Sequence, residues 1–517
     1  MRRLLGTGAA IALAAIAAPA AQAGPVTPVP GLPADALTVM NQAPYASAQW
    51  FVSVRDLATG ASVVSLKANE LAEPGSVVKT YSMGAGWQHF GPDSRVVTPV
   101  KRTGTLSGST LDGNLILVGQ GDMTMDGRTK PDGTVEFANL DHNDANLIPG
   151  ATLTPENPLT GLNKLAQQVR RSGIRRVSGN VIVDDRLWET FELGGEPITP
   201  IVINQNVIDF TTKPRRPGQT ASITMSPKVS PWKVTSEVKT VAAGEPTQIR
   251  VSSPAHGKVV LSGTIAADAD PAVNTYAFAD PARYARTAFI EALERAGVTV
   301  SANPTASNPE KQLPRTSTVT GLRTVARLRS LPLQEEAKYV LKVSYNRGAQ
   351  TMICRLAVAA GSTDCDAGMP KAATIWRRAG LDTTGAVLVD GSGLSGNLIT
   401  MDNEVQLQTI MNARPDVAEW QAALPILGVD GSLALVQPGG PATGKVHAKT
   451  GSLGAPDFFN DRFLLPTKAL GGYMDTKGGR RFAFAIVVTN SVFDELAGVL
   501  EANDDVGKVA AIIQQSY

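Results

Sequence analysis

The residue composition and hydrophobic pattern change along the chain, and this change constrains the fold more than any other feature. From about residue 97 to about 320, short runs rich in Val, Ile and Thr alternate with Gly and Pro, which is typical of strands and turns. Longer helical patterns return from about 321 and are followed by further strands. We therefore expect one α+β domain made from both ends of the chain and interrupted by inserted β-rich structure.

The expected domain boundaries follow these changes. Residues 24–96 and 321–517 would form the main domain, and 97–217 with 258–320 an inserted domain. The stretch 218–257 is the most strand-and-turn-like and would form a small β-rich domain nested in the insertion. A length of 517 residues allows about three domains at roughly 150 residues each.

Hydrophobic periodicity and turn residues also predict individual elements. In the outer segments, strands are expected at 48–54, 62–67, 444–449, 470–475 and 482–489, and helices at 76–89, 331–360, 371–379, 403–413 and 494–515. In the insertion, strands are expected at 114–118, 177–183, 222–225, 248–251 and 258–265, and a helix at 281–297.

The first 23 residues have the layout of a cleavable export signal. Arg2 and Arg3 precede an apolar run that ends at Ala20, and Ala21-Gln22-Ala23 is a small-x-small cleavage site. The alternative is an uncleaved anchor, but the run is shorter than the ~20 residues that a membrane span needs. We expect an exported protein located in the periplasm, without a stable membrane span.

Composition excludes several classes of partner. A formal net charge of +2 provides no global basic field for nucleic acid or anionic lipid.

Two cysteines, Cys354 and Cys365, either form a disulfide in an oxidising compartment or remain two buried thiols. Four scattered histidines without H-E-x-x-H spacing give a zinc site little support, so no metal or other cofactor is expected.

Two glycine patterns imitate nucleotide-binding motifs. Gly391, Gly393 and Gly396 satisfy G-x-G-x-x-G, but no second strand ends in an acidic residue at the required distance. Gly439 begins a G-x-x-x-x-G-K match in which Val446 replaces the Ser or Thr that binds Mg²⁺. We interpret both matches as accidental.

A more informative motif begins at Ser76, where Ser76-Val77-Val78-Lys79 reads S-x-x-K at the start of an expected helix. Residues three apart share a helix face, so the Lys79 amine can lie one turn beyond the Ser76 hydroxyl. A serine hydroxyl needs a neighbouring base to act as a nucleophile, and a lysine amine can serve once it is deprotonated. Alone the motif is weak, because an N-cap Ser followed by a surface Lys is common.

Two further motifs follow in order. The first is Ser344-Tyr345-Asn346, and the second is Lys449-Thr450-Gly451-Ser452 on an expected strand. Strand alternation puts Lys449 and Gly451 on one face and Thr450 on the other, unless the strand is bulged or twisted. A glycine permits close backbone approach, and a lysine provides a point charge for a substrate carboxylate.

With S-x-x-K, S-x-N and K-T-G in this order, the sequence resembles the serine penicillin-recognising enzymes. Among them it is most similar to the D-alanyl-D-alanine carboxypeptidase/endopeptidase family, the low-molecular-mass class C penicillin-binding proteins. Segments 119–122, 390–395 and 427–432 and the long gap before Ser344 add to this likeness, which covers essentially the whole mature chain.

The resemblance implies a β-lactamase/transpeptidase-like catalytic domain, an antiparallel sheet flanked by helices, with inserted β-rich domains. It also implies an enzyme that acts on peptidoglycan stem peptides ending in D-Ala-D-Ala and is inhibited covalently by β-lactam antibiotics. By this likeness Ser76 attacks the carbonyl between the two D-alanines and Lys79 is the general base. Ser344 relays a proton to the leaving amine, and Asn346 holds Lys79 and the substrate amide.

The same likeness assigns the last motif to substrate binding. Lys449 and Thr450 would bind the terminal carboxylate, and Gly451 would let the strand approach the substrate. The backbone N–H groups of Ser76 and Ser452 would form the oxyanion hole, where one donor typically contributes about 10²–10³ in rate. Water would then release the acyl-enzyme.

Several positions depart from the family pattern. Tyr345 stands where Asp is usual, Gln350 where Glu is common, and Met123 where Pro is common. Gly396 replaces a usual Arg, which alters how the distal part of the peptide would be held. His447 shares a strand face with Lys449 and either lines the site or is a bystander.

Two alternative functions remain open on sequence grounds. A β-lactamase would acylate in the same way and deacylate fast, but Tyr345 is out of register for Y-x-N, which would need Asn at Arg347. A catalytically silent wall-binding scaffold of the same fold is compatible with Tyr345 and Gly396. The sequence leaves open the balance of carboxypeptidase and endopeptidase activity, the third residue of the stem peptide and the oligomeric state.

Overall fold

The computed structural model describes residues 25–495 and 497–517. The expected signal peptide at 1–23 lies outside the described residues. Within the described ranges, no helix is both long and apolar enough to cross a bilayer.

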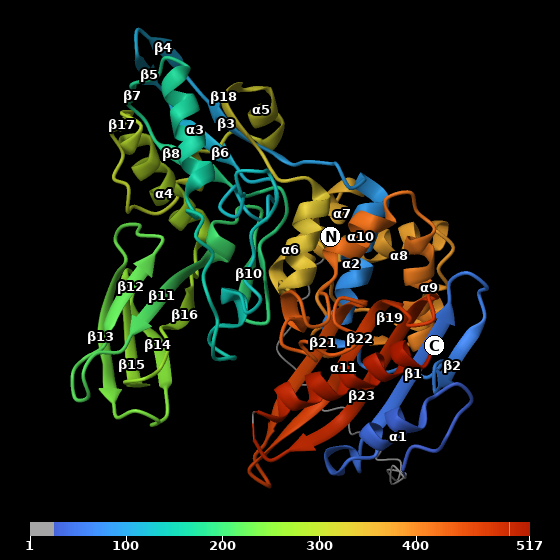
Figure 1. The fold of residues 1–517 in the computed structure, drawn as a ribbon. Helices are drawn as coiled ribbons and strands as arrows, with labels where there is room; N and C mark the ends of the chain where they lie inside the picture. Colours follow the sequence, from blue (N-terminus) through green and yellow to red (C-terminus); the bar gives the residue numbers. More distant parts are fainter. Residues whose placement is uncertain (1–24, 496) are drawn as a thin grey trace, which may run out of the picture.

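The half of the molecule formed by the two ends of the chain is built on a five-stranded antiparallel sheet with strand order β2-β1-β23-β22-β21 (Figure 1). The two N-terminal strands therefore pair with three strands from the end of the chain, which joins the two outer segments into one domain. Its strands are β1 (Gln49–Asp56), β2 (Ser62–Leu66), β21 (Val446–Asp457), β22 (Arg462–Asp475) and β23 (Arg481–Phe493).

Both faces of this sheet are buried, as strand β23 illustrates. Phe482, Phe484 and Ile486 point to a core shared with α1 (Ala34–Met40) and α11 (Gly498–Ser516). The alternate residues, including Ala483 and Ala485, face a second core under the remaining helices. Burial on both faces explains why β23 reads as a nearly continuous apolar run.

The second core lies under a layer of helices that carries much of the site. These helices are α2 (Val78–Phe90), α6 (Leu333–Lys342), α7 (Asn346–Ala359), α8 (Gly368–Arg378), α9 (Met401–Asn412) and α10 (Val417–Ala423). Helix α2 is buried along most of its length and ends at Gly91, whose φ of 83° favours glycine.

The inserted region contains two four-stranded sheets, with orders β18-β3-β6-β8 and β17-β7-β5-β4. Helices α3 (Thr160–Arg171) and α4 (Pro281–Arg295) pack with them around a separate core. The strands are β3 (Val97–Arg102), β4 (Thr105–Ser107), β5 (Thr110–Asp112), β6 (Leu115–Val118), β7 (Arg176–Val177), β8 (Val181–Asp184), β17 (Thr299–Val300) and β18 (Arg323–Arg329).

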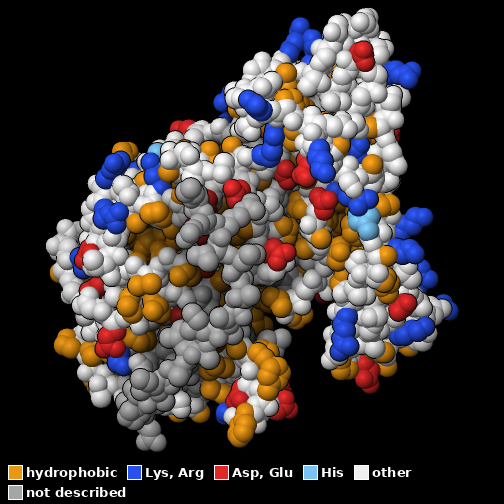
Figure 2. Space-filling view, turned by 180° about the vertical axis from the view of Figure 1, so that it is seen from behind, with side chains coloured by type: hydrophobic (Ala, Val, Ile, Leu, Met, Phe, Trp, Pro, Cys, Tyr) orange, Lys and Arg blue, Asp and Glu red, His pale blue; other side chains and the backbone are white. Residues whose placement is uncertain are grey.

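A further lobe projects from this region and consists of two three-stranded sheets (Figure 1). Seen from behind, a deep indentation separates this lobe from the half that carries the five-stranded sheet, and Lys and Arg side chains gather on the surface of the lobe (Figure 2). Its strands are β11 (Val207–Lys213), β12 (Ser222–Ser226), β13 (Lys233–Val241), β14 (Gln248–Ala255), β15 (Lys258–Ala266) and β16 (Ala272–Ala277).

The pairing of strands in these sheets leads us to propose other positions for two of the expected domain boundaries. A division at 257/258 would separate β14 from β15, although the two strands are hydrogen-bonded neighbours. A division at 320/321 would leave β18 outside the insertion, although β18 pairs with β3. We propose an inserted region of about 97–330 that contains a β-rich lobe of about 207–277.

The remaining elements complete or correct the expected pattern. The helix expected over 331–360 is two helices, α6 and α7, separated at 343–345. The amphipathic helix α3 was not anticipated in the β-rich segment. Short elements comprise α5 (Thr316–Gly321), the hairpin β9 (Phe191–Leu193) and β10 (Glu196–Ile198), and the pair β19 (Ala386–Val387) and β20 (Leu398–Ile399).

Candidate active site

The first site motif lies where the chain enters α2. Gly75 has a φ of 50° and begins a 3-10 turn over Gly75–Val77. Helix α2 begins at Val78, directly after this turn. This geometry places Ser76 in the turn and Lys79 in the first turn of the helix. Ser76 is partly exposed, whereas Lys79 has an exposed fraction of 0%.

Lys79 connects the motif to two other segments. Its Nζ donates to Ser76 Oγ at 2.7 Å, to Asn346 Oδ1 at 2.6 Å and to the carbonyl oxygen of Ser392 at 2.7 Å. The Ser76 hydroxyl, the Lys79 amine and the Asn346 amide therefore form one hydrogen-bonded group, although Ser76 and Asn346 are far apart in sequence.

The second motif occupies the break between α6 and α7. Ser344 has a φ of 60° and is partly exposed, and Asn346 is the first residue of α7. An ion pair holds this break, because Lys342 Nζ donates to both carboxylate oxygens of Asp430 at 2.6 and 2.7 Å. The break turns the chain so that Asn346 reaches Lys79.

The residues of the G-x-G-x-x-G pattern form a tight turn between β19 and β20, not a strand-to-helix phosphate loop. Asp390 Oδ1 accepts from the backbone N–H groups of Ser392 at 2.6 Å and Gly393 at 2.8 Å. Asn397 Nδ2 donates to Asp390 Oδ2 at 2.8 Å. The turn thereby fixes the Ser392 carbonyl that accepts from Lys79.

The third motif lies on β21, at the edge of the sheet. Lys449 is fully buried, and its Nζ donates to the carbonyl oxygen of Thr450 at 2.7 Å. The hydroxyls of Thr450 and Ser432 are 2.7 Å apart. Ser452 is exposed, and its Oγ accepts from Lys468 Nζ at 2.6 Å.

Close backbone packing joins the first and third motifs. A Cβ added to Gly75 would lie 2.8 Å from the backbone nitrogen of Ser452. A Cβ added to Gly451 would collide with the carbonyl oxygen of Pro74. Glycine at 451 thus lets β21 approach the segment before Ser76, whereas the sequence had pointed only to approach of a substrate.

A buried carboxyl group lies behind this arrangement. Glu404 on α9 accepts from the Thr80 hydroxyl at 2.9 Å and from Gln408 Nε2 at 2.8 Å. Complete burial raises the pKa of Glu404 to about 8, although both hydrogen bonds act in the opposite direction. Glu404 is therefore largely protonated at neutral pH.

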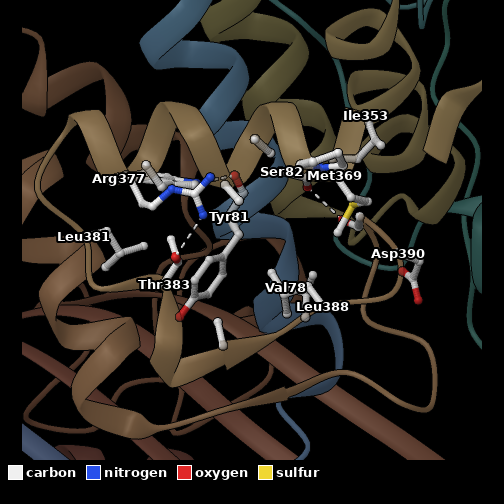
Figure 3. A pocket seen from close by; sticks show the side chains of 16 residues that line it. Val78, Tyr81, Ser82, Ile353, Met369, Arg377, Leu381, Thr383, Leu388 and Asp390 are labelled. Atoms are coloured by element: carbon white, nitrogen blue, oxygen red, sulfur yellow. Dashed lines mark hydrogen bonds between the residues drawn. The ribbon is translucent and has the colours of Figure 1, made fainter. Parts of the chain in front are cut away.

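A cavity of about 400 Å³ lies on another side of α2, between α2 and α8 (Figure 3). Its lining is mostly apolar and includes Val78, Tyr81 and Trp376. Ser82 Oγ donates to the Gly391 carbonyl oxygen at 2.7 Å in its wall. The proposed catalytic residues are not among the described residues that line this cavity.

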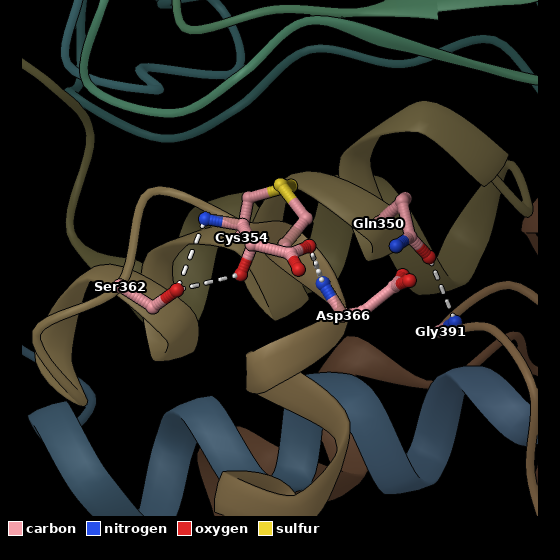
Figure 4. The surroundings of a disulfide bond; sticks show 7 residues. Gln350, Cys354, Ser362, Asp366 and Gly391 are labelled. Carbon is pink, nitrogen blue, oxygen red and sulfur yellow. Dashed lines mark hydrogen bonds between the residues drawn. A yellow bond between two sulfur atoms is a disulfide. The ribbon is translucent and has the colours of Figure 1, made fainter. Parts of the chain in front are cut away.

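Cys354 and Cys365 form a disulfide, with an S–S distance of 1.96 Å, which resolves the two alternatives left by the sequence. The bond ties α7 to the short helix Cys365–Ala367 that precedes α8 (Figure 4). One turn earlier on α7, Gln350 Oε1 accepts from the Gly391 backbone N–H at 2.9 Å. The disulfide thus braces the helix that presents Asn346.

The departures from the family pattern have local structural reasons. Tyr345 is only 2% exposed and its ring packs 5.6 Å from that of Tyr339, so it belongs to the core. Gly396 has a φ of 100°, which an arginine would rarely adopt. The imidazole of His447 lies 3.2 Å from the carbonyl oxygen of Gln421 on α10.

Sequence reasoning missed some of the residues that complete the site. Ser392 and Ser432 lie in segments that had been singled out, but their contacts with Lys79 and Thr450 depend on three-dimensional folding. Glu404 had no sequence signal as a protonated acid, because its burial comes from α9 packing against the distant strands β1, β22 and β23. Lys468 had none either, because a lysine on a strand is normally exposed.

A serine in the turn before α2, a buried lysine in α2, an asparagine from a second helix and a K-T-G strand at the sheet edge form the arrangement expected of a serine acyl-transfer enzyme of the penicillin-recognising class. More specifically, the chain belongs to the D-Ala-D-Ala carboxypeptidase 3 (S13) family, whose model matches residues 34–505.

Curated relatives agree with this membership. A D-alanyl-D-alanine carboxypeptidase from an Actinomadura strain is 27% identical over 462 residues, covering 84% of this chain and 77% of the relative. The carboxypeptidase DacB of Mycolicibacterium smegmatis is 32% identical over 209 residues, or 38% of this chain and 43% of the relative.

Solved structures share the fold. Penicillin binding protein 4 of Haemophilus influenzae superposes with a TM-score of 0.68 at 17% identity, covering 93% of this chain and all of that one. The same protein in complex with a β-lactam superposes with a TM-score of 0.64 at 18% identity, covering 90% of this chain and 97% of that one. The expected multidomain α+β architecture with a β-lactamase/transpeptidase-like domain is confirmed.

Proposed function

We propose that this protein is an exported serine-type D-Ala-D-Ala carboxypeptidase and endopeptidase that acts on peptidoglycan peptides through an acyl-enzyme on Ser76. The observation that carries the proposal is the 2.7 Å contact between Lys79 Nζ and Ser76 Oγ, with Asn346 Oδ1 2.6 Å from the same amine. Family membership supplies the substrate class.

Lys79 would act as the general base. The carbonyl oxygens of Asn346 and Ser392 only accept hydrogen bonds, so a deprotonated amine can still donate to both. The lone pair of the deprotonated amine would accept the Ser76 proton as the hydroxyl oxygen attacks the peptide carbonyl. General base catalysis of this kind contributes about 10²–10⁴ in rate.

The proton would return to the leaving D-alanine amine with Ser344 as the relay, at the break between α6 and α7. Loss of that amine leaves an ester on Ser76, and water then hydrolyses the ester. Asn346 would hold both Lys79 and the substrate amide, which its position at the start of α7 supports.

The K-T-G strand would bind the substrate. Lys449 and Thr450 would pair with the terminal carboxylate, and Gly451 would permit close approach. The N–H groups of Ser76 and Ser452 would form the oxyanion hole, which the packing of Gly75 against Ser452 supports.

Mass spectrometry of the intact protein after treatment with a penicillin tests the proposal. We expect a long-lived adduct on wild-type protein and none on Ser76→Ala. Rapid turnover of penicillin without an adduct would favour the β-lactamase alternative, and an adduct on Ser76→Ala would refute Ser76 as the nucleophile. Release of D-alanine from a pentapeptide distinguishes the enzyme from a silent scaffold, and cleavage of a cross-linked dimer measures endopeptidase activity.

A further inference from the structure

Lys468 is a buried cation at the edge of the proposed site. It lies on β22 directly opposite Ser452 on β21, and its Nζ donates to Ser452 Oγ at 2.6 Å. The residue is only 4% exposed. In the described part of the chain, no carboxylate forms an ion pair with it.

This arrangement is costly for the folded state. A buried ammonium group loses its hydration, and burial lowers the pKa of Lys468 to about 7. A Met or Leu at this position would avoid that penalty while filling a similar volume. The cost points to a role beyond packing.

The direction of the hydrogen bond indicates what the role is. Lys468 Nζ is the donor and Ser452 Oγ the acceptor of this hydrogen bond. The single hydroxyl proton of Ser452 is then unavailable to Lys468 and free to be donated elsewhere. Because Ser452 is exposed, that donor is available to a ligand in the site.

Thr467, the residue before Lys468, supports the same side of the proposed site. Thr467 Oγ1 donates to the carbonyl oxygen of Glu73 at 2.6 Å, three residues before the proposed nucleophile Ser76. Thr467 and Lys468 therefore connect β22 to the segment before Ser76 and to Ser452, respectively. Strand β22 therefore holds both segments that would form the oxyanion hole, the one before Ser76 and the one at Ser452.

We propose that Lys468 is a positioning residue that acts through Ser452. It presents the Ser452 hydroxyl as a donor to the terminal carboxylate of the substrate, and so strengthens selectivity for ligands with a free carboxylate. This inference rests on the proposed function and adds a second lysine, besides Lys449, to the recognition of that carboxylate.

The test compares acylation by a fluorescent penicillin and by the methyl ester of its carboxylate, measured as second-order rate constants. In Lys468→Met we expect the rate for the acid to fall about tenfold, the size of one lost charge-assisted hydrogen bond, with the ester changed less than about twofold. Lys468→Arg, which keeps a donor, should restore most of the preference for the acid.

Ser452→Ala provides the matched variant, because it removes the hydroxyl that Lys468 is proposed to position. It should lower the acid-to-ester ratio to a similar extent, and adding Lys468→Met should then produce no further change in that ratio. If Lys468→Met does not fold, the acid-to-ester ratio of acylation rates in Ser452→Ala alone decides whether the inference holds.

An equal loss for acid and ester in Lys468→Met, or an unchanged ratio in Ser452→Ala, would overturn the inference and leave the proposed function standing. Failure of both compounds to label wild-type protein would overturn the proposed function itself, and the inference with it.

Discussion

The ammonium of Lys342 contacts both oxygens of the Asp430 carboxylate, at 2.6 and 2.7 Å, and so joins the end of α6 to the loop before β21. Ser344 follows Lys342 by two residues, and Gly431 packs against the Lys342 backbone. One ion pair thus aligns the second motif with the segment that supplies Ser432 to Thr450.

Asp430→Asn should destabilise the protein and slow acylation. The change leaves Lys342, which is 1% exposed, without its anionic partner, at a cost of about 1–3 kcal/mol. Urea unfolding measures this cost, and penicillin labelling measures the acylation rate.

Asp475→Asn is the matched control, because it breaks the exposed ion pair with Arg481 and should cost no more than about 1 kcal/mol. Equal destabilisation by the two variants would contradict the role given to the Lys342–Asp430 pair.

The sequence located the three motifs because each is short and local, but it could not locate the contacts between them. Lys79 and Asn346 meet only because the chain breaks at Ser344, and the continuous periodicity over 331–360 concealed that break. Lys468 and Glu404 owe their unusual state to burial by elements distant in sequence. The same limit applies to the boundary expected at 320/321, because the sequence of β18 does not reveal that its partner is β3.

Lys79→Ala should lower the acylation rate by about 10²–10⁴ while leaving the fold intact, because it removes the proposed base. Stopped-flow labelling with a fluorescent penicillin measures the rate, and circular dichroism checks the fold. Lys258→Ala, an exposed lysine on β15, serves as the control and should label at the wild-type rate. A Lys79→Ala rate within tenfold of wild type would argue for a different base.

Glu404 should make stability depend on pH. Burial raises its pKa from 4.5 to about 8, so between these values the folded state binds more protons than the unfolded state. Stability contributed by this group is therefore fully present below 4.5 and decreases as the pH rises towards about 8.

Glu404→Gln keeps an uncharged side chain of similar shape. It should remove the part of the pH dependence of stability that Glu404 contributes. Urea unfolding of both proteins at about pH 5 and about pH 8 measures it, and the variant should gain relative stability at the higher pH. Burial also raises the pKa of Asp122 to about 7, so some slope should persist in the variant. Identical slopes in the two proteins would show that Glu404 is ionised in the folded state.

Removing the disulfide should lower the free energy of unfolding, because the bond restricts the conformations of the unfolded chain. The bond joins cysteines 11 residues apart, and closing a loop of this order stabilises a protein by about 2–4 kcal/mol. The double variant Cys354→Ala with Cys365→Ala should show this loss in urea unfolding, and a reductant should lower the stability of wild-type protein to a similar level. A reductant that destabilised the double variant equally would exclude the disulfide as the cause.

Gly75→Ala should abolish acylation although Ser76 and Lys79 are unchanged. The residue has a φ of 50°, and an added Cβ would lie 2.8 Å from the Ser452 backbone nitrogen, so β21 would be pushed away from Ser76. Separation of the two N–H donors would disrupt the proposed oxyanion hole, where one donor contributes about 10²–10³ in rate. Gly60→Ala is the control, since Gly60 has a φ of 73° but open space around it, and it should lose some stability without losing penicillin labelling. Normal labelling of Gly75→Ala would mean that the contact with Ser452 is not needed for acylation.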